Sequence, residues 1–234
     1  SKGRARAFQI ALSVEKDPVA RKTLRLRSYF RQFSSSRSVP DAYYAYVSGR
    51  RETPIDLASE AEWQRADAEA MCATLGDVED DRRVESALAR LQLGSSPWIL
   101  IGGPPCQAYS LVGRSRNAGI LGYRADDDHR HFLYRRYLDV LHKHRPDAFI
   151  LENVKGVLSS NVSEGPIFPR MLEDLSEPSR ALHAPRRNSV GYRIVAAATG
   201  TCFEPGTSPF DVDPRDFVVK AERHGMGQAR HRVI

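Results

Sequence analysis

Residues 98–107 read Trp-Ile-Leu-Ile-Gly-Gly-Pro-Pro-Cys-Gln, and this stretch decides the fold. Residues 98–101 form a short apolar run that two glycines and two prolines end, which is typical of a buried parallel strand opening into a loop. The glycines let a ligand approach the backbone closely, and the prolines fix the direction of the chain. Cys106 therefore lies just beyond a strand, where a thiolate can act as a nucleophile.

A second strand of the same kind, at residues 148–151, ends in Glu152. Further strands are predicted at 8–14, 192–198 and 217–221, and helices at 18–30, 56–75, 82–91, 132–141 and 167–175. Asp17 and Pro18 suit the N-cap and first position of the first helix. This alternation predicts an α/β fold with a doubly wound, mostly parallel sheet, in which ligands bind beyond the carboxyl ends of the strands. Cys106 and Glu152 both lie at that edge.

Two stretches of the chain break the alternation. Residues 34–54 are rich in Ser, Tyr and Arg, and we expect them to form a mobile excursion. Residues 108–128 hold three glycines among polar residues and indicate a long loop, which in a compact domain is usually functional or disordered.

Composition narrows the class of protein. The 234 residues suit one domain, without an apolar run of the ~20 residues that a membrane span needs and without a signal peptide at the start. Cys72, Cys106 and Cys202 are too scattered for a disulfide framework or a metal site, which favours a reducing compartment. A net charge of +6 allows a polyanionic partner, but the basic run in residues 21–51 is interpreted as a solvated face.

Four histidines raise the question of a metal site. They fall on a polar helix face without a carboxylate or cysteine partner nearby, so we expect solvated side chains and no metal: His129, His131, His142 and His144.

Three short motifs follow one another along the chain. They are Pro104-Pro105-Cys106-Gln107, then Glu152-Asn153-Val154, then Gln228-Ala229-Arg230-His231-Arg232. A carboxyl such as Glu152, held in a dry pocket, can keep its proton near neutral pH and donate it to a ring nitrogen. Arg230 and Arg232 would favour the Cys106 thiolate if the fold brings them across. In order and separation, these motifs resemble the DNA (cytosine-5)-methyltransferase family.

The resemblance implies an S-adenosylmethionine-dependent, Rossmann-like enzyme. Cys106 would add to C6 of a cytosine rotated out of double-stranded DNA, and Glu152 would engage N3 and the exocyclic amine. The C5 atom would take the methyl group of S-adenosylmethionine, leaving S-adenosylhomocysteine. Arg232 would contact the cytosine O2, and Arg230 would support Cys106 and its loop.

The resemblance also assigns cofactor and DNA contacts. Glu15 would receive the ribose hydroxyls and Asp77 the adenine amino group, while Pro104 and Leu133 would lie beside the cofactor. The DNA contacts would be Gln107, Ser110, Arg114, Arg116 and Gln228. From the residues alone, Glu15 suits the positive N-terminus of the following helix equally well, and Leu133 suits a core position.

The sequence also departs from the family. Its first strand and Gly-rich turn are expected before residue 1, and its target-recognition domain beyond Ile234, so residues 1–234 are expected to be an incomplete catalytic domain. Lys16 stands where many members have an apolar group. We expect a bacterial restriction–modification methyltransferase in the nucleoid-associated cytoplasm, with a cognate endonuclease. A catalytically inactive DNA- or partner-binding member and a tRNA cytosine-5 methyltransferase relative remain alternatives.

Overall fold

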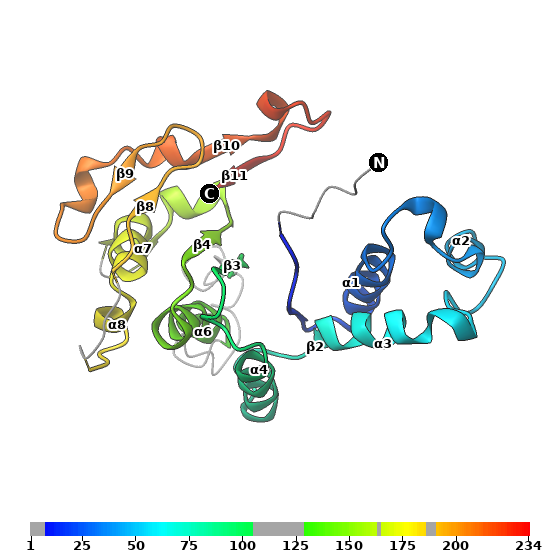
Figure 1. Ribbon diagram of the computed structural model, residues 1–234. Coiled ribbons are helices and arrows are strands. Elements are labelled where there is room, and N and C mark those ends of the chain that lie inside the picture. The colour runs from blue at the N-terminus through cyan, green and yellow to red at the C-terminus, as the bar shows by residue number, and fades with distance from the viewer. Residues whose placement is uncertain (1–7, 105–128, 163–164, 186–190) are drawn as a thin grey trace, which may run out of the picture. The chain divides into compact units, whose positions relative to one another are not determined.

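The structure, a computed structural model, describes residues 8–104, 129–162, 165–185 and 191–234, and for residues 129–132 and 161–162 it describes the backbone alone (Figure 1). The chain divides into two compact units, Ser1–Gln92 and Leu93–Ile234, and each is described by itself. Both units mix helices with short strands. Among the described helices, none is long and apolar enough to cross a membrane.

The first unit contains one parallel pair of strands with helices between and after them. Strand β1 pairs with β2 in parallel, from Ser13 opposite Ala70 to Glu15 opposite Cys72. In chain order the elements are β1 (Ser13–Glu15), α1 (Pro18–Arg31), η1 (Ser36–Ser38), α2 (Asp41–Val47), η2 (Leu57–Ser59), α3 (Glu60–Glu69), β2 (Ala70–Cys72) and α4 (Val78–Arg90).

Helix α1 begins as the sequence predicts. Asp17 is its N-cap, and Oδ1 accepts hydrogen bonds from the backbone N–H groups of Val19 and Ala20 at 2.7 and 2.9 Å. The hydrogen bonds from Ala20 and then Val19 lower the pKa of the Asp17 carboxyl. Pro18 follows at the first helical position, where its missing N–H costs no hydrogen bond. The predicted cap is confirmed.

The early arginines join helices rather than form only a solvated face. Arg21 and Arg25 of α1 both reach Asp67 of α3, with N–O distances of 2.7 and 2.5 Å. Arg25 also lies over the ring of Trp63, 4.1 Å from its centroid. Burial raises the pKa of Asp67, but the hydrogen bonds from Arg25 and Arg21 outweigh burial and the net shift is downward.

Two predictions for this unit are wrong. The expected buried strand at 8–14 is reduced to β1, and Phe8 before it is 76% exposed. The helix expected at 56–75 ends at Glu69, and Ala70–Cys72 form β2 instead. Three residues are too few to show strand periodicity, so pairing with β1 decides their conformation.

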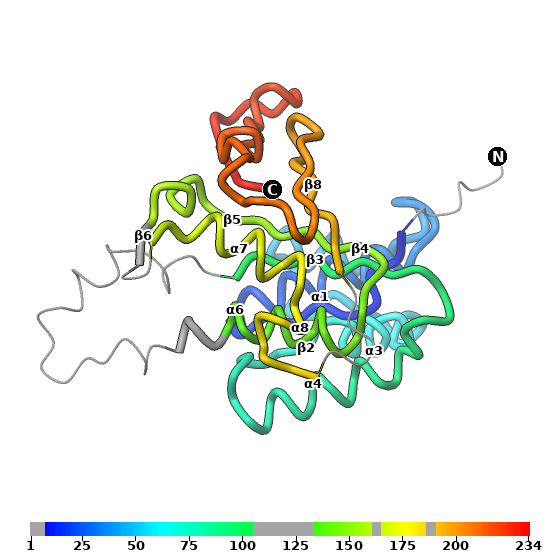
Figure 2. Tube along the Cα trace, turned by 90° about the vertical axis from the view of Figure 1, so that its left-hand side faces the viewer, coloured from blue at the N-terminus to red at the C-terminus, as the bar shows by residue number. Residues whose placement is uncertain are grey.

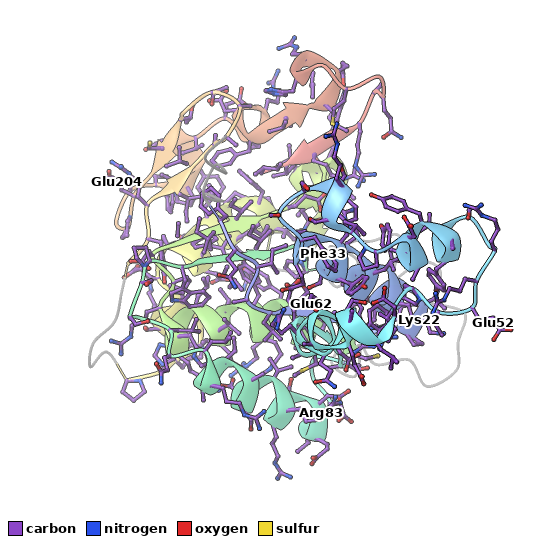
Figure 3. All side chains as sticks on the ribbon, turned by 45° about the vertical axis from the view of Figure 1, so that its right-hand side comes forward. Lys22, Phe33, Glu52, Glu62, Arg83 and Glu204 are labelled. Atoms are coloured by element: carbon purple, nitrogen blue, oxygen red, sulfur yellow. The ribbon has the colours of Figure 1, made fainter. Side chains whose placement is uncertain are left out.

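An aromatic cluster supports the segment that the sequence predicts to be an excursion. The fully buried Tyr29 of α1 packs edge-on against Phe33 and Trp63, with ring centroids 5.2 and 5.4 Å apart, and lies 6.3 Å from Tyr43 of α2. Phe33 is labelled beside these helices in Figure 3. Residues 34–54 thus contain η1 and α2, and their mobility stays a prediction.

The second unit contains a parallel pair, β3–β4, and an antiparallel sheet in the order β10–β11–β5. Its elements are β3 (Ile99–Gly102), α6 (His129–His144), β4 (Ala148–Leu151), β5 (Asn153–Val154), η5 (Lys155–Ser159), β6 (Asn161–Val162), β7 (Gly165–Pro166), α7 (Ile167–Ser176), α8 (Pro178–Ala181), β8 (Ile194–Val195), β9 (Cys202–Phe203), η6 (Pro209–Asp211), η7 (Pro214–Phe217), β10 (Val218–Lys220), η8 (Ala221–His224) and β11 (His231–Val233).

The architecture confirms a mixed α/β fold with parallel strand pairs. Helix α6 lies between β3 and β4 in the chain, as a crossover connection requires. The strand expected at 192–198 is only β8, which forms a two-stranded antiparallel pair with β9. Short pairs of this kind do not amount to the doubly wound sheet that the sequence predicts.

One face of β3–β4 joins the core of the second unit. Leu100, Phe149 and Leu151 pack against a cluster that includes Leu141 of α6 and Leu172 of α7. On the opposite face the exposed fraction reaches 70% at Ile101. The alternation follows from the two-residue period of a strand and fixes which face carries the core.

Tyr137 of α6 fixes the end of β3. Its ring is buried, and its hydroxyl donates to the Ile150 carbonyl at 3.2 Å. Burial raises the pKa of Tyr137 above its usual value. A Cβ at Gly102 would lie 2.8 Å from a Tyr137 ring carbon, so glycine is required there by close packing.

His142, also on α6, corrects a smaller prediction. It is half-buried, and Nδ1 lies 2.9 Å from the Ser179 hydroxyl of α8. It is therefore not the solvated histidine that the sequence predicts.

Replacement of Gly102 by alanine should destabilise the second unit. Because the buried Tyr137 ring cannot move aside freely, we expect a loss of about 1–3 kcal/mol in the free energy of unfolding, measured by denaturant titration. Gly156→Ala is the matched control, since its Cβ would meet nothing closer than Val154 Cγ2 at 4.0 Å. Equal stability of the two variants would contradict the packing argument.

Candidate active site

Glu152 stands where the two parallel strands end. It follows β4 directly, and its backbone N–H donates to the Gly102 carbonyl of β3 at 3.0 Å. A Cβ on Gly103 would lie 3.1 Å from Glu152 Oε2, so the glycine backbone runs close past the carboxylate. The position of Glu152 at the carboxyl edge of β3–β4 is as predicted.

Asn153 links this edge to the loop that leads to the cysteine. Its side chain is buried, and Nδ2 donates to the Pro104 carbonyl at 3.1 Å. Its Oδ1 accepts the backbone N–H of Val154 at 2.9 Å. The Pro104 carbonyl accepts a hydrogen bond and the Val154 N–H donates one, so only one orientation of the Asn153 amide makes both bonds. We gave Asn153 no role from the sequence, in which a single amide carries no signal of its own.

Strand pairing brings the arginine motif to Glu152. Strand β11 runs antiparallel to β5, with Arg232 opposite Val154 and Val233 opposite Asn153. Figure 2 traces β4 running directly into β5. Two motifs some eighty residues apart in the sequence therefore become neighbours in one sheet.

Both arginines of the motif approach the same carboxylate oxygen. Arg232 Nε lies 2.6 Å and Arg230 Nη2 3.8 Å from Glu152 Oε1. The Arg232 contact is a close ion pair without the alignment of a hydrogen bond, and its Nη1 donates to the His231 carbonyl at 2.9 Å. The arginines thus neutralise Glu152. The positive field that we expected them to supply to Cys106 stays a prediction.

Exposure bears on the proton-donor role of Glu152. Its side chain is 41% exposed in the described part of the chain. The dry pocket that the sequence interpretation requires is therefore not formed by the described residues alone. A base lying against Glu152 would itself remove water from the carboxyl group.

His231 faces away from this cluster. Successive side chains of a strand point to opposite faces, so His231 and Arg232 lie on different sides of β11. Its Nε2 lies 2.8 Å from Glu222 Oε1 of η8. A backbone hydrogen bond of its own residue, followed by the bond with His231, lowers the pKa of the exposed Glu222.

Several predicted site residues lie outside the described residues. These are Cys106, Gln107, Ser110, Arg114 and Arg116, all within 105–128. Gln228 is described, exposed and three residues before β11, and Leu133 is half-buried on α6. Their predicted contacts with DNA and cofactor stay predictions.

In the first unit, Glu15 lies at the carboxyl end of β1, and Asp77 lies five residues beyond the end of β2. Glu15 ends β1, and its Oε1 accepts the Asp17 N–H at 2.9 Å. Asp77 is the N-cap of α4, and its Oδ1 accepts from Glu79 N and Asp80 N, both at 3.0 Å. Each carboxylate has a local structural role that uses one oxygen, which is compatible with a ligand on the other.

Comparison with known proteins agrees with these motifs. The sequence model of the C-5 cytosine-specific DNA methylase family matches residues 73–179. The Type II methyltransferase M.Bpa9945I of Bacillus paralicheniformis is 28% identical over 244 residues, covering 97% of this chain and 48% of that protein. M.AquIA, a Type II methyltransferase of Picosynechococcus, is 32% identical over 100 residues, covering 43% of this chain and 36% of its own length.

Through residues 73–179 the chain is similar to the C-5 cytosine-specific DNA methylase family, and the Type II methyltransferases support that assignment. It spans about half the length of M.Bpa9945I and about a third of that of M.AquIA. No solved structure matches the chain significantly.

Two replacements of Asn153 should show how much each of its two hydrogen bonds contributes to stability. Asn153→Ala removes both and leaves the Pro104 carbonyl and Val154 N–H without these partners, so we expect a loss of about 1–3 kcal/mol in the free energy of unfolding. Asn153→Asp keeps an acceptor for Val154 but sets a carboxylate against the Pro104 carbonyl, so it should also destabilise. If denaturant titration finds Asn153→Asp as stable as the wild type, the bond to Pro104 contributes nothing.

Proposed function

We propose that the protein methylates C5 of cytosine in double-stranded DNA, with S-adenosylmethionine as methyl donor and Cys106 as nucleophile. The observation that carries the proposal is the convergence of Glu152 with Arg230 and Arg232 beside the loop that leads to Cys106. A carboxylate between two guanidinium groups, at the end of parallel strands, suits recognition of one polar base edge.

The finer fold assignment belongs to the same proposal. We take residues 1–234 as a catalytic domain with the doubly wound, mostly parallel sheet of S-adenosylmethionine-dependent methyltransferases. The parallel pairs β1–β2 and β3–β4 support this, as does α6 between β3 and β4.

The protein's own groups would carry the covalent chemistry. The Cys106 thiolate adds to C6 of the rotated-out cytosine, and the electron pair of the C5–C6 bond moves toward N3. N3 takes its proton from Glu152, which must be in its protonated form for this step rather than in the ionised form that the two arginines pair with. When bound, S-adenosylmethionine supplies the methyl group to C5. A base then removes the C5 proton, the C5–C6 double bond returns, Cys106 leaves as thiolate and N3 gives up its proton.

The arginines would hold the pyrimidine edge. Arg232 is assigned to the cytosine O2, which a guanidinium N–H can donate to. Arg230 is assigned to support of Cys106 and its loop. Before a base enters, both arginines keep the Glu152 carboxylate at the strand end.

The residues present fit an adenosine-bearing cofactor. Glu15 would accept the ribose hydroxyls and Asp77 the adenine amino group, each through the oxygen that its local hydrogen bonds leave over. Glu15 is the last residue of β1 and Asp77 comes after β2, so both lie toward the carboxyl ends of one parallel pair, where such sheets bind nucleotides. Pro104 and Leu133 are assigned to the apolar contacts of the cofactor.

The DNA contacts are proposed at Gln107, Ser110, Arg114, Arg116 and Gln228. Because the relatives are named Type II methyltransferases, we favour DNA over tRNA and place the protein in a bacterial restriction–modification system with a cognate endonuclease. Its place would then be the nucleoid-associated cytoplasm.

Covalent trapping tests the nucleophile. The full-length protein should form a denaturation-resistant adduct with duplex DNA containing 5-fluorocytosine, because fluorine cannot leave as the C5 proton does. We expect Cys106→Ser to abolish the adduct, read as a shifted band on a denaturing gel, and Cys202→Ser, which alters an exposed cysteine, to keep it. An adduct that survives Cys106→Ser would refute the assignment, and its absence in the wild type would favour an inactive member.

Glu152→Gln tests the proton donor. The amide keeps the size of the side chain but cannot protonate N3, so adduct formation should slow by roughly 10²–10⁴-fold. Glu204→Gln is the control, since Glu204 is exposed on the second unit and labelled at its surface in Figure 3. Equal rates for both variants in quenched time courses would remove Glu152 from the chemistry.

A further inference from the structure

The inference concerns a groove between η5 and η7 of the second unit. The cavity measures about 540 Å³, is open to solvent, and is lined by Lys155, Gly156, Leu158, Ser159, Asp213, Pro214 and Arg215. Leu158 packs against the core, so the floor is partly apolar and two cations from separate elements stand at the rim. Neither cation has a role in the chemistry proposed above.

The rim keeps a positive charge available for a ligand. In the part of the chain that the structure describes, no carboxylate forms an ion pair with Lys155. Asp213 is the single acid of the lining, and its Oδ1 accepts the Arg215 backbone N–H at 2.9 Å and lies 3.4 Å from Arg215 Nε. The Arg215 side chain is still 88% exposed, which leaves its outer N–H groups free to donate.

The groove begins beside the candidate cytosine site. Lys155 is the third residue after Glu152, so their Cα atoms lie within about 11 Å. Val154, just before it, stands opposite Arg232 in the sheet. A nucleotide whose base meets Glu152 remains bonded to its sugar and flanking phosphates, and these must pass along nearby protein surface.

We propose that Lys155 and Arg215 hold one phosphodiester of the DNA strand close to the target cytosine, with the apolar floor under the sugar. Guanidinium and ammonium groups are the side chains that bind phosphate oxygens, and such contacts position DNA without reading its sequence. The inference rests on the proposed function and adds a backbone contact to it.

Salt dependence of DNA binding tests the groove. For the full-length protein, the slope of log K against log salt should fall in magnitude by roughly 0.9 in the Lys155→Ala/Arg215→Ala variant, since one phosphate contact is lost. Binding should weaken by the same factor for duplexes of different sequence. Lys155→Arg/Arg215→Lys keeps both charges and should keep the wild-type slope.

The matched control removes two other positive charges of the same unit. Arg180 and Arg193 are exposed and lie 3.1 and 3.7 Å from Glu177 and Glu204, so Arg180→Ala/Arg193→Ala should leave the slope unchanged. A wild-type slope in Lys155→Ala/Arg215→Ala would overturn the proposed phosphate contact. The proposed methylation would still stand if the adduct experiment supports it. A slope change seen with RNA but not with duplex DNA would overturn the assignment to DNA. A wild-type protein that binds no duplex DNA would overturn both.

Discussion

The candidate site depends on the pairing of β5 with β11. Strand β5 has only two residues, yet it continues from the strand end that carries Glu152 and accepts β11 along its edge. Arg232 is thereby set opposite Val154 and within 2.6 Å of the Glu152 carboxylate. The pairing supplies a countercharge to the partly buried carboxylate, which offsets the cost of removing that charge from water.

Asn153 gives the same edge its second anchor. A buried amide that donates to one backbone group and accepts from another can adopt one orientation, which ties the Pro104 carbonyl to the strand carrying Glu152. Tyr137 and Gly102 fix the end of β3 by close packing. The chain at Gly102–Pro104, just before Cys106 in the sequence, is therefore held by contacts from β4, β5 and α6.

The groove beside the site extends the same logic to the ligand. In the proposed function, Glu152 and the two arginines would recognise the polar edge of a base, whereas the charge of a DNA strand lies on its phosphates. Lys155 and Arg215 are placed by η5, which continues from β5, and by η7, which precedes β10. The β10–β11–β5 sheet and the turns that adjoin it thus carry two arginines beside Glu152 and two cations that line the groove.

By itself, the sequence determined the motifs, the mixed α/β fold, the capped start of α1 and the place of Glu152 at a strand end. These features depend on residues close together in the sequence, so the local residue pattern is enough to predict them. Tertiary structure alone decided that Ala70–Cys72 form a strand, that Phe8 is exposed, and that Arg230 and Arg232 meet Glu152. It also gave Asn153 and Lys155 their places. Each of these depends on contacts between segments far apart in the chain, and two- or three-residue strands leave no periodic pattern from which such contacts can be predicted.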